Sequence, residues 1–196
     1  VNRKLDEAGK SEEHLLTFIN NILEFAKIES GDITLKESAT DISLAAKRSY
    51  DLLAEEAEKR GITLEYWSEF INPYIYQDVI HTTDVVMNII HNAMKYTPAG
   101  GKVRFGIRQL PGKNDDECIV QFVCEDSGIG ISKEFLPHIY DAFEKEDNQI
   151  NKDNPSSGLG LNIAKILITL MKGTIEVTSE PGKGTTVKTS QPHRYA

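Results

Sequence analysis

The sequence has few cysteines, few aromatic residues and no long apolar run. Two of its 196 residues are cysteine, and Phe, Trp and Tyr together make up 8%. No apolar stretch approaches the ~18 residues that cross a bilayer, so we expect no membrane span, no membrane contact and no secretory signal. Acidic residues outnumber Lys and Arg by 30 to 22, and the resulting net charge of -8 argues against a nucleic-acid partner.

The two cysteines, Cys118 and Cys124, lie in one apolar segment, ECIVQFVCED, which is typical of a strand. At about 3.3 Å per residue they are ~20 Å apart, which is too far for a disulfide bond. They also lack the spacing and the histidine partners of a zinc site. We therefore expect free thiols in a reducing compartment, and take the cytoplasm as the setting.

Apolar periodicity and turn residues predict alternating helices and strands. Helices are expected over residues 11–28, 41–61, 83–96, 133–143 and 159–173, and strands over 33–35, 62–67, 74–76, 102–110, 117–126 and, as a hairpin, 173–190. This order predicts an α/β sandwich, with helices on one face of a mixed sheet. The expected N-terminal helix is so apolar that it must pack against another element. This element is either its own domain or the partner helix of a helical hairpin or dimer.

The second of these helices has capping residues at both ends. Asp41 is a good N-cap and Gly61 a good stop. The apolar residues at helical spacing are expected to face inward. They are Leu44, Leu53, Ala57 and either Tyr50 or Leu52.

A first group of polar residues lies in the segment NIIHNAMKYT. Asn88 and Asn92 are four residues apart and share one helix face, which Lys95 and Tyr96 extend by a turn. Amide oxygens can ligate a hard cation such as magnesium, an ammonium group can neutralise a phosphate, and a phenol ring can stack on a base. By spacing alone, a polar face of the helix is the better interpretation.

Three glycine-rich segments follow. Asp126, Gly128 and Gly130, with Ile131 after them, combine an acid at a strand end with a tight turn. Residues 157–161, Ser157-Gly158-Leu159-Gly160-Leu161, open a helix whose unpaired N–H groups can receive an anion. Gly182 to Thr185 is typical of a hairpin turn. Between the first two lies a polar run, 144–157, that is typical of a mobile lid or a disordered loop.

Taken together, these segments resemble the sensor histidine kinases of two-component systems. Residues 88–97, 126–130, 143, 158–160 and 182–185 are similar in order and spacing to the N box, first glycine box, F box, second glycine box and third glycine motif of that family. The resemblance implies a Bergerat-type ATP-binding fold of the GHKL superfamily. It covers about residues 33–190, and residues 5–35 resemble the second dimerisation helix.

The resemblance also implies the roles of individual residues. Asn88, Asn92 and Lys95 would be catalytic, with the two asparagines holding Mg²⁺ and the ATP phosphates. Asp126 would accept a hydrogen bond from the adenine amino group, Phe143 would anchor the lid and Lys145 would reach the γ-phosphate. The implied nucleotide-binding set is completed by Tyr96, Gly128, Gly130, Ile131, Ser157, Gly158, Leu159, Gly160, Leu161 and Thr185.

The family phosphorylates a histidine on the first dimerisation helix, beside an acid and an Arg-Thr-Pro stretch that this sequence does not contain. His14 aligns with the second helix, and His91 could line the rim of the site. We expect residues 1–31 to be a remnant of the dimerisation domain, 32–191 the ATP-binding domain and 192–196 a tail. The implied partners are a response-regulator receiver domain and, in the intact kinase, a second copy.

Two other functions stay open. One is a non-catalytic module for nucleotide binding or dimerisation, against which the complete set of motifs argues. The other is an ATPase of the same superfamily, of the chaperone or topoisomerase type. Those ATPases place a water-activating glutamate at the start of the N box, where this sequence has Asn88.

Overall fold

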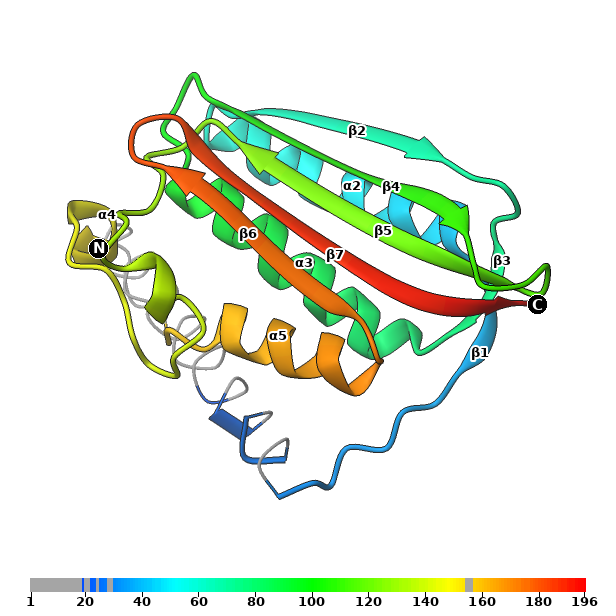
Figure 1. The fold of residues 1–196 in the computed structure, drawn as a ribbon. Coiled ribbons are helices and arrows are strands. Elements are labelled where there is room, and N and C mark those ends of the chain that lie inside the picture. The colour runs from blue at the N-terminus through cyan, green and yellow to red at the C-terminus, as the bar shows by residue number, and fades with distance from the viewer. Residues whose placement is uncertain (1–18, 20–21, 24, 28–29, 154–156) are drawn as a thin grey trace, which may run out of the picture.

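The fold is a seven-stranded mixed sheet with its long helices packed on one face (Figure 1). The computed structural model describes residues 19, 22–23, 25–27, 30–153 and 157–196. Its elements are β1 (Ser38–Asp41), α2 (Ile42–Lys59), β2 (Thr63–Glu69), β3 (Tyr74–Gln77), α3 (Val79–Tyr96), β4 (Lys102–Pro111), β5 (Glu117–Asp126), a 3₁₀ turn (Leu136–His138), α4 (Gln149–Asp153), α5 (Gly160–Leu170), β6 (Thr174–Glu180) and β7 (Gly184–Tyr195). This arrangement confirms the predicted sandwich.

The strands follow the order β1-β3-β7-β5-β4-β2, and β6 pairs with β7 beside this path. Only β2 and β4 run parallel; the other pairs are antiparallel. The long strand β7 carries β6 along residues 184–190 and β3 at residues 194–195, so two short strands share one of its edges. In the centre, Asp126 at the end of β5 is paired with Thr185 near the start of β7.

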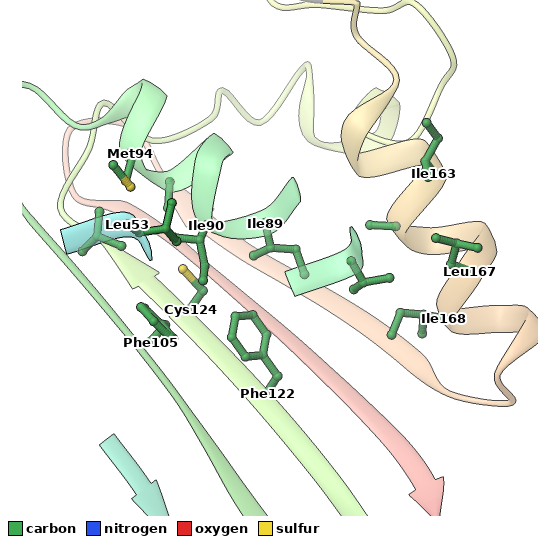
Figure 2. Packing of buried hydrophobic residues seen from close by; sticks show 14 of the residues in the cluster. Leu53, Ile89, Ile90, Met94, Phe105, Phe122, Cys124, Ile163, Leu167 and Ile168 are labelled. Carbon is green, nitrogen blue, oxygen red and sulfur yellow. The ribbon is translucent and has the colours of Figure 1, made fainter. Parts of the chain in front are cut away.

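The core lies between the sheet and the helices α2, α3 and α5. Alternate residues of the central strands, Phe105, Phe122 and Cys124, point at the helices (Figure 2). They meet Ile89 and Ile90 of α3, which are at most 1% exposed. Both cysteines are buried and free, as the strand spacing predicted.

Helix α2 begins and ends where its capping residues predict. The Asp41 carboxylate accepts hydrogen bonds from the backbone N–H groups of Ser43 (2.9 Å) and Leu44 (3.3 Å). At the other end Gly61 has a φ of 68°, the left-handed conformation common after a helix. The inward positions were partly wrong, because Leu44 is 49% exposed and Leu52 73% exposed, whereas Leu53 is buried and Tyr50 packs on the core.

Several boundaries differ from the expected ones. Residues 33–35 form no strand, and the first strand comes later, at Ser38–Asp41. Helix α3 begins at Val79, because Asp78 caps it by accepting from the His81 N–H at 3.0 Å. Residues 133–143 contain only a 3₁₀ turn at Leu136–His138 instead of an α-helix. Strand β7 continues through residues 192–195, which were expected to form a tail.

Of the expected N-terminal helix, residues 19, 22–23 and 25–27 are described, and they are helical; the others, including His14, lie outside the described residues. Phe25 packs on the core, whereas Ile19, Ile22 and Leu23 are exposed. Within the part of the chain that the structure covers, no helix combines the length and the hydropathy needed to cross a bilayer.

Candidate functional site

The N-box asparagines meet the second glycine segment at the start of α5. A Cβ atom on Gly160 would lie 3.3 Å from Asn88 Oδ1 and 3.8 Å from Asn92 Nδ2. Both asparagines are partly exposed, so their amides remain accessible. Helices α3 and α5, whose contact residues are about 70 positions apart in sequence, thus bring two amides close to the N-terminal end of a helix. This combination can bind an anion, or an anion together with a cation.

Asp126 lies at the end of β5, between the first and third glycine segments. Its Oδ1 atom accepts hydrogen bonds from the backbone N–H groups of Gly128 at 2.8 Å and Thr185 at 3.2 Å. Burial raises the pKa of this carboxyl, and the two N–H donors oppose the rise. Because both of these bonds go to Oδ1, the backbone holds the carboxylate in a fixed orientation.

The turn after Asp126 packs tightly against the end of α3. The Ile129 N–H donates to the Tyr96 carbonyl oxygen at 3.1 Å, and a Cβ atom on Gly128 would lie only 2.4 Å from that oxygen. Only glycine allows the chain to approach so closely. On the far side, Gly130 lies against the Glu180 carbonyl, and the Ile131 N–H donates to Ser179 Oγ at 2.9 Å.

The two ends of the polar segment between Phe143 and Gly158 are hydrogen-bonded to each other. The Phe143 N–H donates to the Gly158 carbonyl oxygen at 3.2 Å. The Phe143 ring is 52% exposed and makes an edge contact with the Phe25 ring, with 5.9 Å between centroids. Phe143 therefore contacts the N-terminal helix as well as the second glycine segment.

Two cationic side chains lie near each other beside this segment. Burial, and secondarily the nearby charge of Lys145, lower the pKa of the Lys95 ammonium to about 8. An anion placed between these two lysines would favour the charged form of Lys95 and so offset both effects on its pKa. Lys95 Nζ and the Tyr96 hydroxyl each donate to Asn151 Oδ1 at 2.8 Å, so α4 lies against the end of α3.

The remaining predicted residues have mixed positions. Ser157 is buried and its Oγ accepts from the Leu159 N–H at 3.2 Å. The Leu159 side chain is fully buried in the core, so only its backbone is available to a ligand. Leu161 also packs on the core. Thr185 Oγ1 is 2.9 Å from Ser179 Oγ, behind Asp126.

The described histidines do not gather at this site. His91 is half-exposed and lies near Glu56 of α2, with 3.9 Å between Nε2 and Oε2, rather than at the glycine segments. His138 lies 2.8 Å from Asp141, and His193 contacts the Tyr76 carbonyl oxygen. Among the described residues, no group of three or more His, Cys, Asp or Glu could hold a metal ion.

Sequence reasoning missed three residues that shape the site: Asn151, Glu146 and Ser179. Ser179 accepts from the Ile131 N–H and donates to the Gly184 carbonyl oxygen at 3.0 Å, which joins the first and third glycine segments. Glu146 Oε1 accepts from the Ser132 N–H at 3.1 Å. None of them belongs to a motif, and Ser179 and Asn151 each also contact a residue about 50 positions away in sequence.

The fold and this site together define a Bergerat-type sandwich with a polar segment beside paired asparagines. Residues 77–194 match the family described as histidine kinase-, DNA gyrase B-, and HSP90-like ATPase, and the chain belongs to that family. The match begins at β3, although β1, α2 and β2 are part of the same sheet and core.

Similar proteins include sensor kinases. The non-motile and phage-resistance protein of Caulobacter vibrioides is 35% identical over 95% of this chain and 22% of its own length. The autoinducer 2 sensor kinase/phosphatase LuxQ of Vibrio parahaemolyticus is 28% identical over 96% of this chain and 22% of its own. The sensor histidine kinase GacS of Pseudomonas protegens is 31% identical over 93% and 20%. The chain thus spans about a fifth of these relatives, and the resemblance to sensor histidine kinases is confirmed.

Solved structures agree with this assignment. Full-length ShkA in complex with AMPPNP has a TM-score of 0.82 and 26% identity, over all of this chain and 39% of that one. The histidine kinase ThkA in complex with the response regulator TrrA has a TM-score of 0.69 and 19% identity, over 97% of this chain and 50% of that one. At that identity the second likeness shows the fold alone.

Proposed function

We propose that this chain is the ATP-binding catalytic domain of a two-component sensor histidine kinase. In this function it transfers the γ-phosphate of ATP to a histidine on a dimerisation helix. The observation that carries the proposal is the convergence of Asn88 and Asn92 with the start of α5 at Gly160, at the same end of the fold as Asp126. The AMPPNP bound to the structural relative ShkA supports the same ligand class.

The site has two ends that suit different parts of the nucleotide. At one end, Asp126 offers a carboxylate oxygen that its backbone bonds do not use, which suits the adenine amino group. At the other, Lys95, Lys145 and the N–H groups at the start of α5 suit the phosphates. Phosphoryl transfer needs mainly positioning and neutralisation of charge, so this division is sufficient for a kinase domain.

The asparagines fit a magnesium ion carried by the phosphates. Amide oxygens are hard ligands, and Mg²⁺ is typically held by few protein groups together with phosphate oxygens. Asn88 Oδ1 faces Gly160, where the phosphates would lie. When bound, the ion would supply neutralisation of the phosphate charge. Asn88 and Asn92 would hold it, and Lys95 and Lys145 would orient the phosphate chain.

The family supports the partners as well. We infer that the intact kinase is a homodimer and passes its phosphoryl group to a response-regulator receiver domain in the cytoplasm. The response-regulator complex of ThkA and the exposed apolar residues Ile19, Ile22 and Leu23 support these inferences. Hydrolysis of ATP is the less favoured function, because Asn88 cannot activate water as a glutamate does.

The first test replaces Asn92 with alanine. We expect the native chain to bind ATP·Mg²⁺ with a dissociation constant between micromolar and millimolar, and to phosphorylate a separate fragment that carries the dimerisation helix. Asn92→Ala should lower transfer about 100-fold or more, because the ion loses an oxygen ligand. Calorimetry and a phosphorylation assay with labelled ATP measure the two effects. Asn88→Ala should behave alike.

A suitable control is Asn114→Ala. Asn114 is exposed in the turn before β5, about 30 Å from the Asp126 end of that strand. This variant should keep binding and transfer. A folded native chain that produces no heat with ATP·Mg²⁺ would contradict the proposed function, and transfer that survives in both N-box variants would contradict the role of the asparagines.

A second test concerns the lid, residues 144–157, of which 154–156 lie outside the described residues. The segment has only Ile150 as an aliphatic residue, and ordering each residue costs about 1–2 kcal/mol. We expect its amide protons to gain protection with an ATP analogue and Mg²⁺, and to gain less with ADP, because Lys145 and the N–H groups near Gly158 bind the γ-phosphate. Exchange mass spectrometry measures this. Equal exchange in the free, ADP and analogue states would remove the lid role.

A further inference from the structure

The side chain of Asn151 connects the lid to the end of helix α3. Its Oδ1 atom accepts two hydrogen bonds, from Lys95 Nζ and from the Tyr96 hydroxyl, both at 2.8 Å. Its Nδ2 atom donates to the Glu146 carbonyl oxygen at 2.9 Å. A side-chain amide has two acceptor positions and two donor hydrogens, so three of the four are used. One side chain thus joins two residues of α3 to the backbone of the lid.

The lid around Asn151 is also fixed at its other end. The Asn151 N–H donates to Asn148 Oδ1 at 3.0 Å, which caps the short helix α4. Glu146, whose carbonyl oxygen Asn151 contacts, accepts through Oε1 from the Ser132 N–H at 3.1 Å. Residues 146–151 therefore bridge the chain after β5 and the end of α3, with Asn151 as the contact to α3.

The two donors that meet at Asn151 come from residues with different expected roles. Lys95 faces the phosphate end of the proposed site, and Tyr96 the adenine or ribose side. Asn151 Oδ1 fixes the direction of both groups relative to each other. Since an amide is neutral, it orients the Lys95 ammonium without cancelling the charge that a phosphate would require.

We propose that Asn151 is a positioning residue, which holds the Lys95 ammonium and the Tyr96 hydroxyl in register for the nucleotide and couples them to the fold of the lid. The proposal rests on the proposed function for its ligand, ATP·Mg²⁺. Its structural part, the coupling of the lid to α3, does not depend on any ligand and can be measured separately.

The first variant is Asn151→Ala, which removes all three side-chain bonds. Without nucleotide, amide exchange over residues 146–151 should become at least tenfold faster, because a tenfold change corresponds to only about 1.4 kcal/mol and three hydrogen bonds are lost. The dissociation constant for ATP·Mg²⁺ should rise about five- to tenfold for the same reason. Thermal unfolding of the domain should change little, because residues 146–151 contribute none of the buried core side chains.

The second variant, Asn151→Asp, separates positioning from lid order. A carboxylate still accepts from Lys95 and Tyr96, and its charge strengthens the contact with Lys95, but it cannot donate to the Glu146 carbonyl oxygen as the Asn151 amide does. Lid exchange should therefore rise, by about threefold, but less than in Asn151→Ala. The same charge lies beside the phosphates and competes for Lys95, so ATP should bind at least tenfold more weakly. If Asn151 merely ordered the lid, affinity would follow lid protection, and this variant would bind ATP more tightly than Asn151→Ala.

Asn114→Ala is the control for loss of an asparagine amide remote from the site, and it should match the native chain in both measurements. Unchanged lid exchange in Asn151→Ala overturns the coupling. ATP affinity within twofold of native, or tighter, in Asn151→Ala overturns the positioning role. If the native chain itself binds no ATP·Mg²⁺, the proposed function and the positioning role fail together, while the exchange measurement still decides whether Asn151 couples the lid to α3.

Discussion

Replacing Gly184 with alanine should destabilise the domain by about 3–5 kcal/mol, a large share of the 5–15 kcal/mol typical of a domain. Gly184 has a φ of 97°, and an added Cβ atom would lie 1.8 Å from the Asp126 carbonyl oxygen. The variant therefore combines the strain of a left-handed residue with a collision between two strands. Relief would require β7 to move away from β5 beside Asp126, so the site would be lost with the fold.

Gly182 provides the matched control two residues earlier. It also has a positive φ, 75°, but a Cβ atom there would meet no heavy atom within 4 Å. Gly182→Ala should cost only about 1–2 kcal/mol, from the backbone strain alone. At roughly 2–4 °C per kcal/mol, thermal unfolding followed by circular dichroism should show a drop near 10–15 °C for Gly184→Ala and of a few degrees for Gly182→Ala. Equal melting temperatures would show that the β5–β7 contact is loose.

Local sequence signals predicted the fold wherever one residue type decides the outcome. Asp41 and Gly61 bound α2 because a capping carboxylate and a left-handed glycine act within a few residues of themselves. The bounds of β4 and β5 were predicted to within one residue, since both strands bury one face against the helices. In such segments the local preference and the tertiary environment require the same conformation.

The errors lie where distant contacts decide. Residues 33–35 have strand-like composition, but pairing with β3 begins only at Ser38. The continuation of β7 to Tyr195 depends on β3 and β5, neither of which is near it in sequence. The segment 133–143 has helical spacing, yet Pro137 at the start of its 3₁₀ turn removes a backbone donor.

The candidate site shows the same division. The motifs identified Asp126, Asn88 and Asn92 because each lies in a recurring local pattern. Asn151 lies in a polar run with several similar residues, and its contacts are with side chains 55 and 56 positions away. Leu159 is the opposite case, because it lies inside a motif but places its side chain in the core, so that only its backbone could contact a ligand.

Asp126→Asn should abolish recognition of adenine and leave the fold intact. In the native chain Asp126 Oδ1 accepts from the N–H groups of Gly128 and Thr185. The asparagine oxygen can take over both bonds, and rotation of the amide is disfavoured because it would turn an NH₂ group toward two donors. The NH₂ group is thereby held where the second carboxylate oxygen was, and it faces the adenine amino group, donor against donor. Loss of a charged hydrogen bond is worth about 1.5–3 kcal/mol, so ATP should bind about 10- to 150-fold more weakly.

The same orientation predicts a change in base preference, which a general disruption of the site would not produce. Inosine triphosphate carries a carbonyl oxygen where adenine has its amino group, and the side-chain amide that Asp126→Asn introduces can donate to it. The ratio of ITP to ATP affinity, measured by calorimetry with Mg²⁺, should therefore rise at least tenfold, while the melting temperature stays within a few degrees of native. Asn114→Ala should leave the ratio unchanged. If Asp126→Asn binds ATP as well as the native chain, or loses both nucleotides equally, then Asp126 does not read the base, and its carboxylate serves only to join the two glycine segments through Gly128 and Thr185.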